Sequence, residues 1–279
     1  MSNKFSKNFK KIASEKKPHL SERKLLKNIK KGFENQEFKM YLQFIVDSKQ
    51  GKIASAETLS RWENAAGEVV FPGTYIGIME KSGLITKFDY YMFEMVCKKL
   101  AQWKDTELAN ITLSCNLTRI TISEKDFVQK IKEISNKYDF DRNKLLIEIT
   151  EDSIEDNLVV AMLNIIEIKK LGFRIALDDI GSGYTSLVSL CEYPIDVVKI
   201  DRQILLLAET ERGKKLFLGI VSLAHYLNLK VVCEGVETEE QSKLVAESQC
   251  DYIQGWYYSK ALPEADAEKF AIDYINKNL

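Results

Sequence analysis

Acidic residues recur in this sequence at one kind of place, directly after a short apolar run. The positions that share this setting are Glu57, Asn116, Glu148, Asp178, Asp179 and Glu234, of which the second offers an amide in place of a carboxylate. Carboxylate and amide oxygens are the ligands that hard divalent cations such as Mg²⁺ and Mn²⁺ prefer. If these side chains converge, the sequence predicts an oxygen-rich metal site that two ions could share.

Charge repulsion makes such a site dependent on cations. At an effective dielectric constant of about 20, two carboxylates ~5 Å apart repel each other by about 3 kcal/mol. A cluster of five acids therefore has to take up protons or bind metal ions. Two ions a few ångströms apart can activate a water and stabilise both oxygens of an in-line displacement at phosphorus. Lys199 and Arg61 would then offer positive charge to a phosphate.

Each of these residues also has an ordinary structural interpretation. A single acid after a strand is usually a helix cap or a solvated turn residue. We expect Glu239 and Glu240 to be first-turn charges in a capping box that begins at Thr238, and Lys199 alone could simply pair with Asp201. The segment 181–183 lacks the third glycine of a dinucleotide-binding loop. Only the series at successive strand ends favours a shared site.

Alternating strands and helices must bring the acids together. Apolar runs predict strands near residues 38–46, 52–61, 111–117, 144–149, 173–178, 196–200, 230–234 and 252–257. Helical periodicity predicts helices near residues 73–81, 86–104, 124–137, 155–171, 185–191, 211–227, 238–247 and 264–277. This alternation predicts an α/β fold, a TIM-type (β/α)8 barrel. In strand phase, the side chains that point into the barrel are those of Glu148, Asp178, Lys199 and Glu234.

Composition excludes several classes of protein. An apolar fraction of 45% and a charged fraction of 29% are ordinary for a globular chain. No apolar run reaches the ~20 residues of a membrane span, and the lysine-rich start lacks the hydrophobic stretch of a signal peptide. Two histidines, His19 and His225, are too few for a histidine-rich zinc site and argue against a Ser-His-Asp triad. The five cysteines form no CxxC pair, so we expect a cytoplasmic protein without disulfides.

The N-terminal segment is strongly basic. Residues 1–31 contain 11 Lys/Arg and 2 Asp/Glu, a local charge of +9 in a chain of net charge −1. We expect a basic tail over residues 1–20 and a barrel domain over residues 21–279, with Ser21 capping a helix that ends near Gly32. The tail could contact an anionic membrane or nucleic acid, but a solvated linker is the favoured interpretation and no nucleic-acid polymer is expected as a partner.

Several ordered motifs resemble those of the EAL-domain family, the bacterial phosphodiesterases specific for cyclic di-GMP. The resemblance extends over about residues 22 to 265, with Glu57-Thr58-Leu59 at the motif that names the family. The other matching motifs are Cys115-Asn116-Leu117-Thr118, Glu148-Ile149-Thr150-Glu151, Asp178-Asp179-Ile180-Gly181-Ser182-Gly183-Tyr184, Val198-Lys199-Ile200-Asp201, Glu234-Gly235-Val236-Glu237 and Gln254-Gly255. The resemblance implies the EAL variant of the barrel, with the basic segment as an N-terminal helical extension.

The resemblance also implies a role for each clustered residue. Two ions, Mg²⁺ or Mn²⁺, would be held by Glu57, Asn116, Glu148, Asp178, Asp179 and Glu234. The catalytic residues would be Glu57, Lys199 and Glu234, with the lysine positioning the attacking water. The substrate contacts would be Gln43, Arg61, Asp201 and Gln254, with support from Glu151 and Glu237. The reaction would open one phosphodiester bond of cyclic di-GMP to give linear 5′-pGpG, in a homodimer linked through residues 179–186.

Some positions depart from the family pattern without removing a predicted ligand. They are Phe44 for a proline, Thr58 for alanine, Ile180 for an aromatic residue, Ser182 for threonine, and Ser259-Lys260-Ala261 for Gly-Arg-Pro. We expect Thr58 to be tolerated, because a β-branched residue suits a strand and its side chain should face away from Glu57. Phe44 could reshape the substrate rim. These changes leave an alternative open, in which a catalytically weak or inactive EAL domain acts as a cyclic di-GMP sensor or a protein-interaction module.

Overall fold

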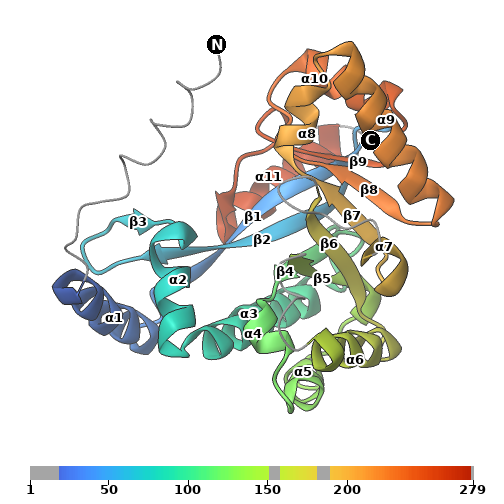
Figure 1. Cartoon of the computed structure of the whole chain (residues 1–279). Helices are drawn as coiled ribbons and strands as arrows, with labels where there is room; N and C mark the ends of the chain where they lie inside the picture. The colour runs from blue at the N-terminus through green and yellow to red at the C-terminus, as the bar shows by residue number, and fades with distance from the viewer. Residues whose placement is uncertain (1–18, 151–157, 181–188, 278–279) are drawn as a thin grey trace, which may run out of the picture.

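Eight strands close into a barrel in the computed structural model, which describes residues 19–150, 158–180 and 189–277. The barrel strands are β1 (Phe38–Asp47), β2 (Ile53–Glu63), β4 (Thr112–Asn116), β5 (Leu145–Thr150), β6 (Arg174–Ile180), β7 (Val197–Ile200), β8 (Lys230–Cys233) and β9 (Tyr252–Gln254). Their order is β1-β9-β8-β7-β6-β5-β4-β2, and pairing of β1 with β2 closes the ring (Figure 1). The TIM-type barrel predicted from the sequence is confirmed.

The first strand departs from a uniform parallel barrel. β1 runs antiparallel to both β2 and β9, whereas the other pairs of barrel strands are parallel. A parallel pair needs a crossover of about a dozen residues or more, and residues 48–52 are too short for one. Asp47 instead forms a tight turn, in which its side chain accepts hydrogen bonds from the backbone N–H groups of Lys49 and Gln50. A β-hairpin thus takes the place of the first strand-helix unit.

Helices cover the outside of the barrel (Figure 1). They are α1 (His19–Glu34), α2 (Pro72–Ser82), α3 (Ile85–Trp103), α4 (Arg119–Ile122), α5 (Phe127–Ser135), α6 (Leu158–Lys170), α7 (Ser189–Glu192), α8 (Arg202–Leu207), α9 (Glu211–Tyr226), α10 (Glu239–Glu247) and α11 (Glu264–Lys277). A 3-10 turn, η1 (Arg142–Lys144), and two short strands, β3 (Val69–Val70) and β10 (Leu262–Pro263), complete the described elements. Within the described residues, no helix has the length and apolarity to cross a membrane.

Some helix boundaries differ from those that the sequence predicted. Thr238 caps α10 in the expected capping box. The prediction that Ser21 caps the first helix is wrong, because α1 already begins at His19 and extends past Gly32 to Glu34. The short helices α4 and α8 were not predicted, since four and six residues are too few to show a helical repeat. Parts of the helices predicted at 155–171 and 185–191 lie outside the described residues.

The predicted strand phase is confirmed by two separate hydrophobic clusters. Residues adjacent to the predicted inward positions, including Ile147, Leu177 and Val198, are fully buried in the large cluster between strands and helices. A small cluster inside the barrel contains Leu146 and Val197, which alternate with them along the same strands. The polar residues of the site occupy the inward positions above this small cluster.

The β1–β2 hairpin extends beyond the barrel toward α1 and α2 (Figure 1). One of its faces packs into an aromatic cluster, in which Phe38 stacks on Trp62 with ring centroids 5.6 Å apart and contacts Tyr75 at 5.3 Å. Since strand side chains alternate, the opposite face carries a different set. That set is Gln43, Tyr41, Glu57, Leu59 and Arg61, and it runs from the barrel mouth outward along the hairpin.

Candidate active site

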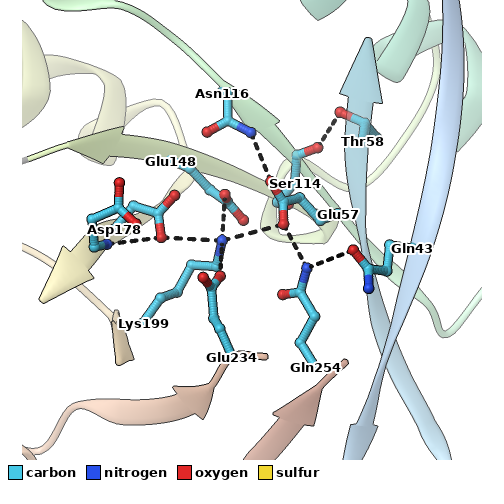
Figure 2. Close-up of polar contacts among 11 residues, drawn as sticks. Gln43, Glu57, Thr58, Ser114, Asn116, Glu148, Asp178, Lys199, Glu234 and Gln254 are labelled. Carbon is cyan, nitrogen blue, oxygen red and sulfur yellow. Dashed lines mark hydrogen bonds and ion pairs between the residues drawn. The ribbon is translucent and has the colours of Figure 1, made fainter. Parts of the chain in front are cut away.

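Lys199 lies at the centre of the predicted acidic cluster (Figure 2). Its ammonium nitrogen is 2.6 Å from Glu234 Oε1 and 2.8 Å from Glu148 Oε2. The same nitrogen is 3.2 Å from Asp178 Oδ1 and 3.4 Å from Glu57 Oε2. Lys199 and Glu148 are each 1% exposed. Three of the acids lie on three different strands and Glu234 directly follows β8, so closure of the barrel brings together residues that are far apart in the sequence.

Glu57 is the most firmly held acid of the cluster. Asn116 donates its amide N–H to Glu57 Oε1 at 3.0 Å, and Gln254 donates to Oε2 at 2.6 Å. Burial by itself would raise the pKa of Glu57, but the charge of Lys199 and these hydrogen bonds hold it below its ordinary value. Glu57 is therefore ionised at neutral pH and available as a ligand.

A bulge in β6 turns two consecutive aspartates toward the site. By strand phase only Asp178 should point inward. The pairing of β6 with β7 shifts register between Leu177 and Ile180, and Asp179 adopts a left-handed backbone conformation with φ of 61°. Aspartate tolerates this conformation better than most residues. As a result, one carboxylate oxygen from each of Asp178, Asp179 and Glu234 lies within 4.8 Å of the others.

Burial opposes ionisation of the other acids. It raises the pKa of Glu148 well above its ordinary value and raises that of Asp178 in the same direction. Burial also raises the pKa of Glu234 to about 8 and that of Asp179 to about 6. Burial would lower the pKa of Lys199, but the surrounding carboxylates hold it well above its ordinary value. Lys199 therefore stays charged, and its single positive charge does not compensate all four carboxylates around it.

The donor set fits divalent cations. Four carboxylates share the charge of Lys199, so additional positive charge would stabilise their ionised forms. Glu148 Oε1 is buried and has no hydrogen-bond partner among the described residues. A buried oxygen without a donor is costly unless a ligand engages it. Oxygen ligands at this density are those of Mg²⁺ or Mn²⁺ sites.

A cleft of about 280 Å³ opens beside the acids. It is lined by Gln43, Glu57, Leu59, Arg202, Glu234, Gly235, Glu237, Gln254, Gly255 and Trp256. Glycine is required at position 255, because a Cβ there would lie 1.9 Å from the Val236 carbonyl oxygen. The predicted residues Gln43, Gln254 and Glu237 are thus brought to one cleft with two of the acids.

Three other predicted residues have different settings. Arg61 does not line the cleft, and its guanidinium lies over the rings of Tyr41 and Phe71 on the outer part of the hairpin. Asp201 caps α8 by accepting a hydrogen bond from the backbone N–H of Gln203 at 2.8 Å. The simple pairing of Lys199 with Asp201 is absent, since the lysine contacts the four acids instead. Glu151 lies outside the described residues.

Two cleft residues were missed by the sequence interpretation. Arg202 donates to Glu237 at 2.8 Å, and Trp256 is 64% exposed at the rim. Each directly follows a residue that was selected, Asp201 and Gly255 respectively. Their position after a strand end was a usable signal, because loops at the carboxyl ends of barrel strands line the site.

A family comparison agrees with this geometry. Residues 26–261 match the model of the EAL domain. The chain belongs to the EAL domain family. Signaling protein YkoW of Bacillus subtilis is 31% identical over 246 residues, which cover 88% of this chain and 31% of YkoW. The bifunctional diguanylate cyclase/cyclic di-GMP phosphodiesterase MucR of Pseudomonas aeruginosa is 27% identical over 240 residues, which cover 86% of this chain and 35% of MucR.

The EAL domain spans about a third of the length of these curated relatives. A solved structure of the MucR phosphodiesterase in complex with cyclic di-GMP matches it with a TM-score of 0.82 at 26% identity. That match covers 88% of this chain and 99% of the MucR chain in the structure. The barrel therefore belongs to a fold that is shared within the EAL domain family.

Two departures of this EAL domain from the family pattern lie away from the cleft. Thr58 is 3% exposed and donates its hydroxyl to the carbonyl oxygen of Ser114, so it faces away from Glu57 as expected (Figure 2). The expectation that Phe44 reshapes the substrate rim is wrong. Phe44 is fully buried and stacks on Phe270 of α11 with ring centroids 5.5 Å apart, because its strand phase is opposite to that of its neighbour Gln43.

The remaining departures from the family pattern lie in different parts of the chain. Ile180 is buried in the core, and Ser182 lies outside the described residues. The carbonyl oxygen of Ser259 accepts a hydrogen bond from Gln43 at 3.1 Å, and the Lys260 ammonium lies 5.4 Å from the centre of the Trp256 ring. This segment therefore touches the cleft, but it leaves the acidic cluster unchanged.

Proposed function

We propose that this EAL domain hydrolyses one phosphodiester bond of cyclic di-GMP to linear 5′-pGpG in the presence of Mg²⁺ or Mn²⁺. The observation that carries the proposal is the contact of Lys199 with four acids at the edge of a cleft. The MucR phosphodiesterase, whose structure contains cyclic di-GMP, is a relative with the same fold. Hydrolysis would lower the level of this second messenger.

The metal ions would be held by the acids and amide that converge in the site. These residues are Glu57, Asn116, Glu148, Asp178, Asp179 and Glu234. When bound, two ions supply Lewis-acid stabilisation of the phosphate oxygens and lower the pKa of a bound water. The bulge at Asp178 and Asp179 supports this arrangement, because it lets two consecutive residues of β6 each direct a carboxylate toward the site.

The residues of the chain would orient the reactants and move the proton. Lys199 and Glu234 are in contact at 2.6 Å, so a water between the cleft and these groups would meet both a cation and a carboxylate. Glu234 also lines the cleft, so its carboxylate is positioned to take a proton from that water. We assign Glu234 to accept the proton of the attacking water and Lys199 to orient that water. Gln43 and Gln254 would contact the substrate across the cleft.

The experiment is a hydrolysis assay of the purified protein with cyclic di-GMP, followed by chromatography of the linear product. We expect turnover with Mg²⁺ or Mn²⁺ and none with a chelator. Glu57→Gln keeps the shape of the side chain but removes the ligand charge, so we expect it to abolish turnover. Absence of linear product from the wild-type protein at micromolar enzyme would refute the proposal.

The alternative, a sensor or interaction module without catalysis, rested on the departures from the family pattern. Thr58 and Phe44 do not line the cleft, and none of the predicted acidic ligands is replaced by another residue. These two departures therefore do not favour loss of activity. Binding of cyclic di-GMP with undetectable hydrolysis would support the alternative.

Other properties follow as proposals of the same kind. All five cysteines are free thiols, four of them buried, which supports a reducing, cytoplasmic setting. A homodimer and a separate basic tail over residues 1–20 are proposed from the sequence resemblance and charge alone. Light scattering of the purified protein, with and without residues 2–19, would test both.

A further inference from the structure

Arg61 forms no ion pair with any carboxylate of the described residues, and Glu57 of the acidic cluster lies four residues before it on the same strand. Its guanidinium carbon lies 4.7 Å from the centre of the Phe71 ring and 5.6 Å from the centre of the Tyr41 ring. One of its N–H groups donates to the Ser60 carbonyl oxygen at 2.8 Å. Both rings are within the distance at which a cation is attracted to an aromatic face. The charge of Arg61 is thus held in place by rings and remains available to an anion.

The hairpin register places Arg61 on the face that leads to the site. Gln43 pairs with Glu57, Tyr41 pairs with Leu59, and Arg61 follows two residues further along β2. These positions share one face of the hairpin because side chains alternate. Arg61 is four residues beyond Glu57, or about 13 Å along an extended strand. Leu59, between them, lines the cleft, and Arg61 is the next residue beyond Leu59 on this face of β2.

Within the described residues, Phe71 makes no ring contact other than the one with Arg61. Its side chain is 61% exposed, so it contributes little to the hydrophobic core. It occupies the N-cap position of α2 without a side-chain cap hydrogen bond, a position that polar residues normally fill. The contact that remains is the one with Arg61. Tyr41 is anchored differently, because its hydroxyl donates to Glu63 Oε1 at 3.0 Å.

We propose that Phe71 and Tyr41 form an aromatic clamp that orients Arg61 for a phosphate group of the substrate. They are positioning residues, and Arg61 is the group that would touch the phosphate. A flexible arginine loses rotamer freedom when it binds a ligand, and a guanidinium that is already held against two rings loses less. The proposal rests on cyclic di-GMP as the ligand, as set out under the proposed function.

The test is the affinity for cyclic di-GMP, measured by calorimetry in the Glu57→Gln background so that turnover does not interfere. The rotamer freedom that Arg61 regains in Phe71→Ala corresponds to a rise in Kd of about twofold to tenfold. Phe71→Trp, which restores an aromatic face, should keep the affinity. Tyr226→Ala removes another highly exposed aromatic residue, 87% exposed on α9, and should leave Kd unchanged. Thermal unfolding should show the same fold for all variants.

A double-mutant cycle separates the clamp from direct stacking on a guanine base. If Phe71 acts through Arg61, Phe71→Ala should have no further effect once Arg61→Ala is present. An unchanged Kd for Phe71→Ala, an equal loss in the Arg61→Ala background, or absence of nucleotide binding would each overturn the clamp. In the turnover assay, Phe71→Ala in otherwise wild-type protein should raise KM and leave kcat unchanged. Binding with a Phe71 effect but no wild-type turnover would refute the proposed hydrolysis and leave the clamp standing.

Discussion

Replacing Lys199 with methionine removes the positive charge that four buried carboxylates share. The ammonium nitrogen lies between 2.6 and 3.4 Å from oxygens of all four acids and is 1% exposed. Methionine fills a similar volume, so the substitution mainly changes charge. Removal of one partner from a buried ion pair typically costs about 3–5 kcal/mol, because the remaining charge is left without compensation.

The loss should depend on pH, because the acids can escape repulsion by taking up protons. Glu234 has a folded-state pKa of about 8 against an ordinary value of 4.5, so the native state binds more protons than the unfolded state between these pH values. Stability from this group is fully present below pH 4.5 and falls as pH rises through 8. At about 1.4 kcal/mol for each pH unit, Glu234 accounts for a change on the order of 5 kcal/mol. Without Lys199, the free energy of unfolding should fall more steeply as pH rises.

The assay is thermal unfolding with a chelator at pH 6 and pH 8.5. We expect Lys199→Met to lower Tm by about 10 °C at pH 8.5, since ~1 kcal/mol corresponds to about 2–4 °C in a domain of this size. At pH 6 the decrease should be clearly smaller, and added Mn²⁺ should raise Tm more in the variant than in the wild type.

Lys243→Met is the matched control for this assay. Its ammonium contacts Glu239 at 2.6 Å, but both side chains are more than half exposed, so the pair contributes at most about 1 kcal/mol. A loss of stability in Lys199→Met that is equal at both pH values would refute the assignment of Lys199 as the shared counter-charge of the cluster.

Three further substitutions test the surroundings of the site. Thr58→Ala removes a buried hydroxyl that bonds to β4 and should cost about 1–2 kcal/mol in urea unfolding; a tenfold fall in kcat would contradict its position outside the cleft. Burial raises the pKa of Asp89 to about 6 from 3.8, so its stability contribution falls as pH rises through 6. Asp89→Asn should remove this pH dependence of the free energy of unfolding, measured from pH 4 to 8. A large loss of stability in this variant at pH 8 would argue against this role of Asp89. Gly255→Ala should destabilise by about 3 kcal/mol because its Cβ would collide with backbone, whereas Gly77→Ala in α2 meets no atom within 4 Å and should raise Tm slightly. Equal Tm values for the two alanine variants would refute the packing argument.

Much of the site could be predicted because local sequence controls strand phase. Apolar runs of the right length predict the strands, and a period of two then assigns each side chain to the barrel interior or to the helices. Glu148, Asp178, Lys199 and Glu234 were selected in this way, and the structure brings them together. The same rule would have placed Phe44 in the core, since it is adjacent to the inward-facing Gln43.

Tertiary structure decided what each polar group contacts. Lys199 and Glu57 are 142 positions apart, and only closure of the barrel determines that they meet, so a lysine that could have paired locally with Asp201 is shared by four acids. The second aspartate of the site depends on a bulge, which is a feature of pairing between two strands and leaves no periodic signal. The rings around Arg61 come from β1 and from the residue before α2, and packing of the hairpin against that helix brings them to one cation. Sequence by itself determined which residues face inward, because that depends on the backbone repeat; their partners depended on contacts between distant segments.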